Sequence, residues 1–337
     1  MANKILIIAP SWVGDTVMAQ PLFMRLKERD PQAIIDVFAP AWVAPILHRM
    51  PEVNEVSTNP FAHGELKLRA RWKLGRAIAR LGYDQAIVLP NSLKSALIPF
   101  FAGIPRRTGF VGEMRHGLLN DARKLDKQAY PLMVERLALL ACHPGESLPR
   151  PLPYPRLSVS EAQRLATLNK LAINDTRPVI ALCPGAEYGP AKRWPEAHFA
   201  ALARALETRG YQTWLVGSAK DQAIGERIVA ESGGICRNLC GKTSLDEAVD
   251  LLASSTAVVT NDSGLMHVAA ALDKPMVTLY GSSSPGFTPP LSDKARILSL
   301  NLTCSPCFQR ECPLGHLDCL RKLAPEAVLA EIDRPPP

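Results

Sequence analysis

The sequence predicts an α/β protein of two Rossmann-like lobes, each built on a parallel sheet. Short apolar runs rich in Val and Ile alternate with amphipathic stretches along the whole chain, as βαβ units do. The length of 337 residues exceeds what one ordinary core accommodates. The segment 143–156 holds five prolines in 14 residues, which excludes a helix or a central strand and indicates an extended connector.

The first lobe is expected to comprise residues 1–156, with the proline-rich connector at its end. Its strands are predicted from short apolar runs, and its helices from the 3.6-residue spacing of apolar side chains between those runs. The predicted strands are Lys4–Ala9, Ala33–Ala39, Gln85–Leu89 and Arg107–Phe110, and the predicted helices are 16–29, 66–81, 92–101 and 130–142.

The second lobe is expected at 157–322, followed by a C-terminal helix and tail at 323–337. Two such lobes with sheets facing across a cleft bind ligands on the loops after the strands. The predicted strands are Pro178–Cys183, Gln212–Val216, Ala257–Thr260, Pro275–Leu279 and Ala295–Ser299, and the predicted helices are 160–170, 196–209, 220–232, 244–254 and 264–272.

The chain lacks the sequence signals of a membrane or secreted protein. No run approaches the roughly 18 apolar residues that a spanning helix needs. The apolar start, Ile5–Ala9, is too short for the apolar core of a secretory signal. We therefore expect a cytoplasmic protein.

Charge is distributed unevenly between the halves. Residues 1–165 carry 22 Lys and Arg against 14 Asp and Glu, whereas 166–337 carry 17 against 18. The basic first half predicts an anionic partner there, such as nucleic acid, a phosphorylated lipid head group or an acidic glycan. Nucleic acid is disfavoured because no basic motif interleaved with aromatic residues is present. The densest basic run, 67–80, is equally typical of a solvated helix face.

The loop after the first predicted strand, Pro10–Asp15, contains a single glycine, Gly14. A dinucleotide site requires the pattern G-x-G-x-x-G at this place, so a dehydrogenase is disfavoured. Asp15 follows the turn where the next helix begins. It is either an ordinary N-cap or a carboxylate placed to act as a general base, and the residues alone leave both open.

Two loops of the second lobe have the composition of a nucleotide site. The loop 184–195 brings Lys192 and Arg193 to a strand end, where cations suit phosphates, although a solvated loop is the plainer alternative. The segment 260–271 passes from a strand through a polar turn into a helix of small residues, whose first N–H groups form a natural pyrophosphate seat. Asp262 beside that seat would repel phosphate and suits sugar hydroxyls. His267 is also typical of a buried core histidine.

Four of the eight cysteines cluster near the C-terminus, with His316 among them. Stable disulfides are unexpected in a cytosolic protein. The spacing permits a structural metal clip but matches no common zinc motif, so reduced thiols packed in a loop are the expected state, with metal binding as the weaker alternative. The cysteines concerned are Cys304, Cys307, Cys312 and Cys319.

Taken together, these motifs resemble those of the lipopolysaccharide heptosyltransferases, glycosyltransferase family 9. The resemblance runs nearly from end to end. It rests on 11–15 (SWVGD), 89–96 (LPNSLKSA), 112–115 (GEMR), 118–121 (LLND), 183–195, 217–221 (GSAKD) and 260–271. It implies an inverting enzyme of the GT-B fold whose C-terminal lobe binds a nucleotide sugar and whose N-terminal lobe binds the acceptor.

The resemblance also implies roles for individual residues. Asp15, in the glycine-aspartate loop with Gly14, falls on the family's base for the acceptor hydroxyl. Lys192 falls on the lysine that contacts the donor phosphates, and Asp262 on the aspartate near the donor sugar. The remaining donor-binding residues implied are Glu187, Asp221 for the ribose hydroxyls, and Ser263, Gly264 and His267 at the phosphate-facing helix start. Related heptosyltransferases acting one step earlier carry threonines in place of Glu187 and Tyr188.

The substrates implied are ADP-L-glycero-β-D-manno-heptose and a Kdo-lipid A core that bears the first heptose, with no cofactor and no metal required. An anionic acceptor fits the basic first lobe, and a lipid-linked one implies peripheral contact with the cytoplasmic face of the inner membrane. The basic residues expected to bind it are Lys67, Arg69, Arg71, Lys73, Lys94 and Arg107. Two alternatives stay open: another GT-B enzyme such as a nucleotide-sugar epimerase, or a non-catalytic nucleotide-binding protein.

Overall fold

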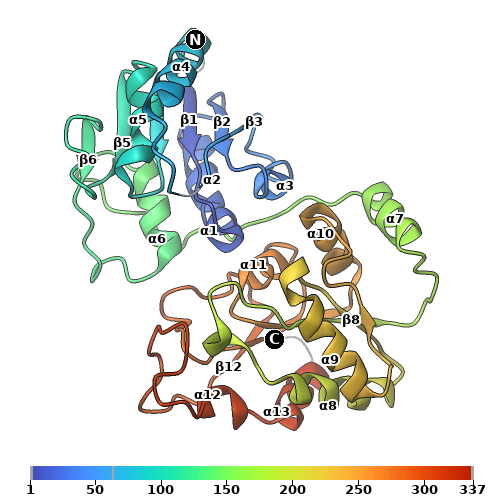
Figure 1. Ribbon diagram of the computed structural model, residues 1–337. Coiled ribbons are helices and arrows are strands. Elements are labelled where there is room, and N and C mark those ends of the chain that lie inside the picture. Colours follow the sequence, from blue (N-terminus) through green and yellow to red (C-terminus); the bar gives the residue numbers. More distant parts are fainter. Residues whose placement is uncertain (1–2, 63, 335–337) are drawn as a thin grey trace. The chain divides into compact units, whose positions relative to one another are not determined.

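The computed structural model describes residues 3–62 and 64–334. The chain divides into two compact units, Met1–Pro155 and Arg156–Pro337, so the division falls at the end of the proline-rich connector. Each unit contains one six-stranded sheet in which all neighbouring strands are parallel. The expected fold class, α/β with two parallel-sheet lobes, is confirmed (Figure 1).

The first unit has the strand order β3-β2-β1-β4-β5-β6. Strand β1 lies at the centre between β2 and β4, and its last four residues are buried, as a strand covered on both faces requires. The strands are β1 Lys4–Ile8, β2 Ile34–Ala39, β3 Glu55–Thr58, β4 Gln85–Val88, β5 Arg106–Phe110 and β6 Asp121–Arg123. The helices are α1 Val13–Met18, α2 Gln20–Arg29, α3 Ala44–Leu47, α4 Leu68–Ile78, α5 Leu93–Phe101 and α6 Met133–Ala138, with 3-10 turns η1 Ala79–Leu81 and η2 Leu139–Ala141.

The second unit repeats this topology, with the order β12-β11-β10-β7-β8-β9. Its core gathers buried side chains from the sheet and from the two helices α8 and α9. The strands are β7 Val179–Cys183, β8 Gln212–Leu215, β9 Arg237–Asn238, β10 Ala257–Asn261, β11 Met276–Leu279 and β12 Ala295–Leu298. The helices are α7 Glu161–Lys170, α8 Glu196–Glu207, α9 Gln222–Ser232, α10 Leu245–Ser254, α11 Gly264–Ala271, α12 Asp318–Arg321 and α13 Pro325–Asp333, with 3-10 turns η3 Pro190–Lys192 and η4 Ala219–Asp221.

The shared topology fixes where ligands bind in each unit. The first strand of each sheet is flanked by the second strand on one side and the fourth on the other, so the direction in which successive strands are added to the sheet reverses there. In open α/β sheets the loops leaving the carboxyl ends of the strands on either side of this switch point form the binding crevice. In the first unit these loops follow β1 and β4, and in the second unit they follow β7 and β10.

Local structure differs from the sequence prediction in a few places. The helix expected at 16–29 is two helices that meet at Ala19, and Pro21 lies in the first turn of the second, where its missing N–H costs nothing. Three short strands, β3, β6 and β9, were not predicted, because they lack an apolar run. No helix within the described part of the chain is long and apolar enough to cross a membrane.

Candidate active site

The switch point of the second unit joins two charged side chains. Lys192 ends the 3-10 turn η3 in the loop after β7, and Asp262 follows β10. The Lys192 Nζ lies 2.6 Å from Asp262 Oδ2, and the side chains are 17% and 4% exposed. An ammonium at the carboxyl ends of parallel strands attracts phosphate, and its neighbouring carboxylate can accept hydrogen bonds from hydroxyl groups. The two residues that sequence reasoning placed in separate loops are therefore partners in one site.

The loop that carries Lys192 is held by the segment that contains the cysteines. Tyr188 donates its hydroxyl to the Phe308 carbonyl at 2.7 Å, and the Ala191 N–H donates to the Arg310 carbonyl at 3.0 Å. A Cβ at Gly189 would lie 2.5 Å from that same Arg310 oxygen, so this contact requires glycine. These bonds keep the loop in place beneath the lysine.

An aromatic ring adds to the support of Lys192. The Lys192 ammonium lies 5.1 Å from the ring centroid of Tyr188, and the Arg310 guanidinium lies 5.3 Å from the same centroid. The ring face attracts both cations and helps to hold two positive groups near one another. A phosphate would therefore meet a region of concentrated positive charge.

Helix α11 begins directly beside this ion pair. Ser263 is its N-cap in extended conformation, and its hydroxyl makes no cap bond, so the first N–H groups of the helix stay available for a ligand. The helix runs from Gly264 to Ala271 and six of its eight residues are buried. Unsatisfied N–H groups and the helix dipole favour an anion at this end.

His267 lies one turn into α11 and is only 5% exposed. Burial, aided by the Lys192 charge, lowers its pKa to about 4 despite the opposing influence of Asp262. The imidazole is therefore neutral at physiological pH. A neutral ring donates one hydrogen bond and accepts another but adds no charge to the phosphate site.

We expect His267 to make the protein less stable as the pH falls. The unfolded chain binds the proton near pH 6.5 and the folded chain only near pH 4, so stability is lost between these values. The expected loss between pH 7 and pH 5 is about 2 kcal/mol. Urea unfolding at both pH values measures it. His267→Asn should lose about 2 kcal/mol less over the same interval, and an equal loss in both proteins contradicts the assignment.

Asn261 ties the two loops of this site together. Its Nδ2 donates to the Pro184 carbonyl at 2.8 Å and its Oδ1 accepts the Trp194 N–H at 3.0 Å. The residue is fully buried. Sequence reasoning did not single it out, although an Asn between a buried strand and an Asp was the available signal.

Asp221 is buried beside the same crevice, and its carboxylate bonds to Ser218 in the loop after β8. Its Oδ2 accepts the Ser218 N–H at 2.9 Å and the Ser218 hydroxyl at 2.8 Å, as a capping carboxylate does. A Cβ at Gly185 would lie 2.5 Å from the Asp221 carboxyl group, so the loops after β7 and β8 touch here only because Gly185 has no side chain. Asp221 thus shapes the site, and its contact with a ribose stays a prediction. Glu187 is exposed and pairs with Lys220.

Asp15 lies at the switch point of the first unit. Helix α1 begins after the N-cap Trp12, which makes Asp15 the third helical residue, half-buried in the first turn. A carboxylate there is stabilised by the helix start. Gly14 is buried beside it. The ordinary N-cap interpretation is wrong, because Trp12 holds the cap position.

The six basic residues proposed for the acceptor are not equivalent. Arg71 is 4% exposed and donates to the carbonyls of Leu66, Lys94 and Glu65 at 2.7, 3.2 and 3.0 Å. Arg107 donates to two carbonyls of its own region, and burial lowers its pKa. Both guanidinium groups bind backbone carbonyls, and contact of either with an acceptor stays a prediction. Arg69 and Lys73 are exposed on α4, Lys67 is exposed beside Glu65, and Lys94 is half-buried.

The cysteine segment forms a compact thiol cluster. Cys304, Cys307, Cys312 and Cys319 all line one cavity of about 20 Å³, and all are free thiols. Backbone N–H groups, that of Leu317 foremost, lower the pKa of the Cys312 thiol. Over residues 3–62 and 64–334 no group of three or more His, Cys, Asp or Glu side chains is arranged to hold a metal ion. The alternative of a metal clip gains no support from this arrangement.

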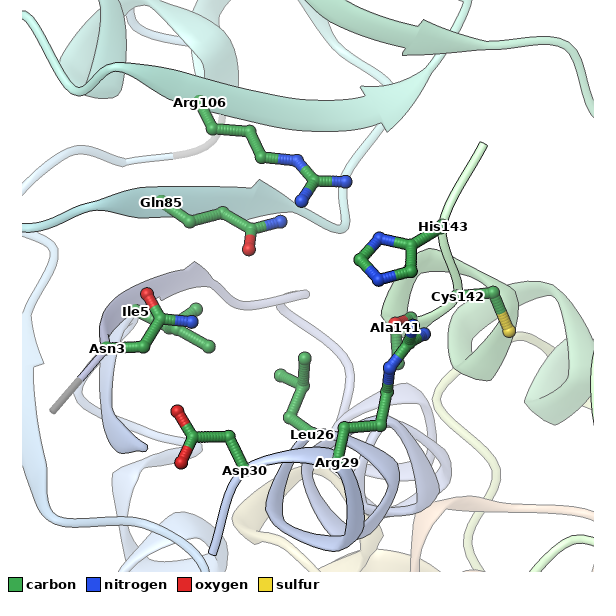
Figure 2. A pocket seen from close by; sticks show the side chains of 10 residues that line it. All are labelled: Asn3, Ile5, Leu26, Arg29, Asp30, Gln85, Arg106, Ala141, Cys142 and His143. Atoms are coloured by element: carbon green, nitrogen blue, oxygen red, sulfur yellow. Dashed lines mark hydrogen bonds between the residues drawn. The ribbon is translucent and has the colours of Figure 1, made fainter. Parts of the chain in front are cut away.

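A larger cavity, of about 230 Å³, opens at the opposite edge of the first sheet (Figure 2). It lies at the amino ends of β1, β4 and β5, lined by Gln85 and Arg106 among others. Both arginines that line it are already paired, since Arg29 bonds Glu146 at 2.9 Å and Arg106 bonds Asp121 at 3.2 Å. Catalytic sites of such sheets lie at the carboxyl ends of the strands, whereas this cavity lies at the amino ends. Its position and its paired arginines both argue against a catalytic site here.

Comparison with known proteins identifies relatives across the whole chain. Residues 71–318 match the model of glycosyltransferase family 9 (heptosyltransferase). Lipopolysaccharide heptosyltransferase 2 of Escherichia coli K12 is 54% identical, over 98% of this chain and 97% of the relative. Lipooligosaccharide heptosyltransferase 2 of Haemophilus influenzae is 52% identical over 88% of each chain. The solved structure of E. coli ADP-heptose LPS heptosyltransferase II superposes with a TM-score of 0.89 at 52% identity, covering 98% and 97% of the two chains.

Two units of parallel sheet that match this structure define a GT-B glycosyltransferase. The family model covers far more than half of the chain, and the E. coli relative is more than half identical over almost its full length. The chain belongs to glycosyltransferase family 9 (heptosyltransferase).

Proposed function

We propose that this protein transfers L-glycero-D-manno-heptose from ADP-heptose to the first heptose of the lipopolysaccharide inner core, with inversion at the anomeric carbon. The observation that carries the proposal is the Lys192–Asp262 pair at the switch point of the second unit, beside the open start of α11. The names of the relatives, lipopolysaccharide heptosyltransferase 2 and ADP-heptose LPS heptosyltransferase II, support the choice of sugar, nucleotide and acceptor.

The second unit binds the donor. Lys192 and the first N–H groups of α11, from Ser263 to Met266, meet the diphosphate, and Asp262 accepts hydrogen bonds from hydroxyls of the donor heptose. As the bond from the anomeric carbon to the phosphate oxygen breaks, negative charge grows on that oxygen, and these fixed positive groups stabilise it. The cationic groups serve the purpose of a divalent metal, so we propose a metal-independent reaction. Glu187 and Asp221 complete the site near the nucleoside.

Asp15 of the first unit is the base. Its carboxylate takes the proton from the attacking hydroxyl of the acceptor, which raises the nucleophilicity of that oxygen. The oxygen bonds to the anomeric carbon from the face opposite the departing ADP, and the β-linked donor gives an α-linked product. The reaction requires that Asp15 and the anomeric carbon come within reach of the same acceptor hydroxyl.

We place the acceptor on the basic first unit, at the cytoplasmic face of the inner membrane. A Kdo-bearing core is anionic, and the exposed side chains of Lys67, Arg69 and Lys73 lie in one segment of that unit. Their attraction to the acceptor is screened by salt because they are exposed. No cofactor takes part in this scheme.

Replacing Arg69 and Lys73 together by alanine should raise the acceptor KM about five- to twenty-fold at low salt and leave the donor KM unchanged. The substitution removes two exposed ion pairs with the anionic acceptor, and each such pair contributes modestly to the free energy of binding. Initial rates at two salt concentrations measure this, and the difference from the unaltered protein should shrink as salt rises. Arg76→Ala with Arg80→Ala, in the last turn of α4 and in η1 directly after it, tests how local the effect is. An unchanged acceptor KM contradicts the assignment.

Mass spectrometry of the product tests the proposed function. The purified protein is incubated with ADP-heptose and a core acceptor that bears one heptose. A product heavier by one heptose is expected, and NMR of that product gives the anomeric configuration. Incubation with ADP-heptose alone separates the epimerase alternative, which would alter the donor without an acceptor. A donor and an acceptor that both remain unchanged overturn the proposal.

A further inference from the structure

Two half-exposed tryptophans lie close to Asp15 in the first unit. Trp12 is 48% exposed and Trp42 is 54% exposed, whereas Trp194 and Trp214 are buried. Trp12 follows β1 and Trp42 follows β2, and these strands are neighbours in the sheet. Both residues therefore belong to the same carboxyl edge of the sheet as Asp15. Indole rings carry a large apolar area, and two of them at one edge form a patch, unlike scattered surface residues that need no explanation.

A hydrogen bond from its indole nitrogen fixes the Trp42 ring. Its Nε1 donates to the carbonyl of Ser11 at 2.8 Å, and Ser11 directly precedes Trp12. This bond satisfies the single donor of the indole and fixes the ring against the loop after β1. Val43, next in the chain, is fully buried, and α3 packs against α1. The ring is thus oriented while more than half of the surface of the residue stays exposed.

Trp12 is fixed through its backbone. Its carbonyl accepts both the N–H and the hydroxyl of Thr16 at 2.9 Å each. Trp12 is the N-cap of α1 and Asp15 is the third helical residue. Side chains at these two positions lie on the same side of the first helical turn, the arrangement that a capping box uses. An exposed aromatic side chain therefore accompanies the proposed base.

The chemistry of this patch suits a sugar ring. A pyranose presents a face of C–H groups, whose slight positive charge complements the negative face of an indole, while its hydroxyls remain free at the rim. A rigid tryptophan offers this contact at a low cost in conformational entropy. A phosphate or carboxylate finds no donor on such a face, so the anionic parts of an acceptor need the basic residues elsewhere.

We propose that Trp12 and Trp42 form a stacking platform for a pyranose ring of the acceptor, which presents a ring hydroxyl to Asp15. This inference rests on the proposed function and adds a neutral sugar subsite to the acceptor site. The platform acts by positioning, and neither tryptophan takes part in proton transfer.

The test uses the full-length protein and an acceptor oligosaccharide from which the lipid chains have been removed. Trp12→Ala and Trp42→Ala should each raise the acceptor KM about ten-fold, which corresponds to about 1.4 kcal/mol, with kcat and donor KM within about two-fold. Trp12→Phe and Trp42→Phe keep an aromatic face and should stay within about three-fold of the unaltered protein. Trp72→Ala, which removes a tryptophan that is 52% exposed on α4, is the matched control and should change nothing. Thermal unfolding checks that every variant is folded.

Several outcomes overturn the platform. An unchanged acceptor KM in both alanine variants does so. So does a fall in kcat at constant KM, because it would mean that the rings only orient Asp15. Loss of binding to anionic lipid vesicles with unchanged kinetics on the lipid-free acceptor would assign the rings to the membrane instead. If the unaltered protein forms no product, the proposed function fails, and calorimetric titration of the lipid-free acceptor into the unaltered protein and Trp12→Ala still decides the platform.

Discussion

Asp15→Asn should lower kcat by about 10²- to 10⁴-fold, the range over which a general base accelerates a reaction. The amide has the size of the carboxylate but cannot take a proton, so the acceptor hydroxyl must attack without assistance. The donor KM should stay the same, because the donor groups belong to the second unit. Initial rates with saturating acceptor measure the effect.

Asp30→Asn is the matched control for this substitution. Asp30 is the C-cap of α2 in the same unit and lines the cavity at the opposite edge of the sheet. Asp30→Asn makes the same chemical change far from the switch point and should leave kcat unaltered. Asp15→Glu adds a second comparison, since a displaced carboxylate should recover part of the rate. If Asp15→Asn retains kcat within about five-fold, Asp15 is not the base.

Replacing Lys192 by methionine should lower kcat by about 10²- to 10³-fold and weaken ADP binding. The side chain keeps its approximate length and loses the charge that stabilises the departing diphosphate. Lys192→Arg should recover only part of the rate, because a planar guanidinium does not reproduce a compact ammonium. Steady-state rates and calorimetric titration with ADP measure the two effects.

The same substitution also threatens stability, which the experiment must separate from catalysis. Asp262 is 4% exposed, and without Lys192 its buried charge loses its partner. The double variant Lys192→Met with Asp262→Asn removes that charge and should regain stability in urea unfolding without regaining kcat. Lys170→Met, which breaks an exposed ion pair with Glu247 in the same unit, is the control. A fully active double variant would show that the ion pair is purely structural.

The fold could be predicted from the sequence because its central strands have a recognisable apolar pattern. β7 is wholly apolar, β1 is apolar after Lys4, and β10 begins with Ala-Val-Val, as strands buried on both faces require. Three of the four edge strands, β3, β6 and β9, escaped prediction for the opposite reason. β6 reads Asp-Ala-Arg and β9 reads Arg-Asn, and such strands form only because a neighbouring strand supplies hydrogen-bond partners.

The candidate site was accessible only in part. Sequence reasoning chose Lys192 and Asp262 separately, each by its position after a strand, and topology explains why they meet. It did not anticipate that Phe308 and Arg310 hold the lysine loop, because contacts between residues about 120 positions apart leave no periodic pattern. Charge density along the sequence cannot distinguish a guanidinium in water from one that binds backbone carbonyls, as that of Arg71 does.

The resting ion pair between Lys192 and Asp262 has a consequence for selectivity. An incoming inorganic phosphate must compete with a buried carboxylate for the ammonium and offers little to the carboxylate in exchange. A nucleotide sugar can satisfy both partners at once, since its diphosphate takes the lysine while its sugar hydroxyls donate to the aspartate. We therefore expect the enzyme without ligand to bind abundant simple anions weakly, and to bind tightly only a ligand that satisfies the ammonium and the carboxylate together.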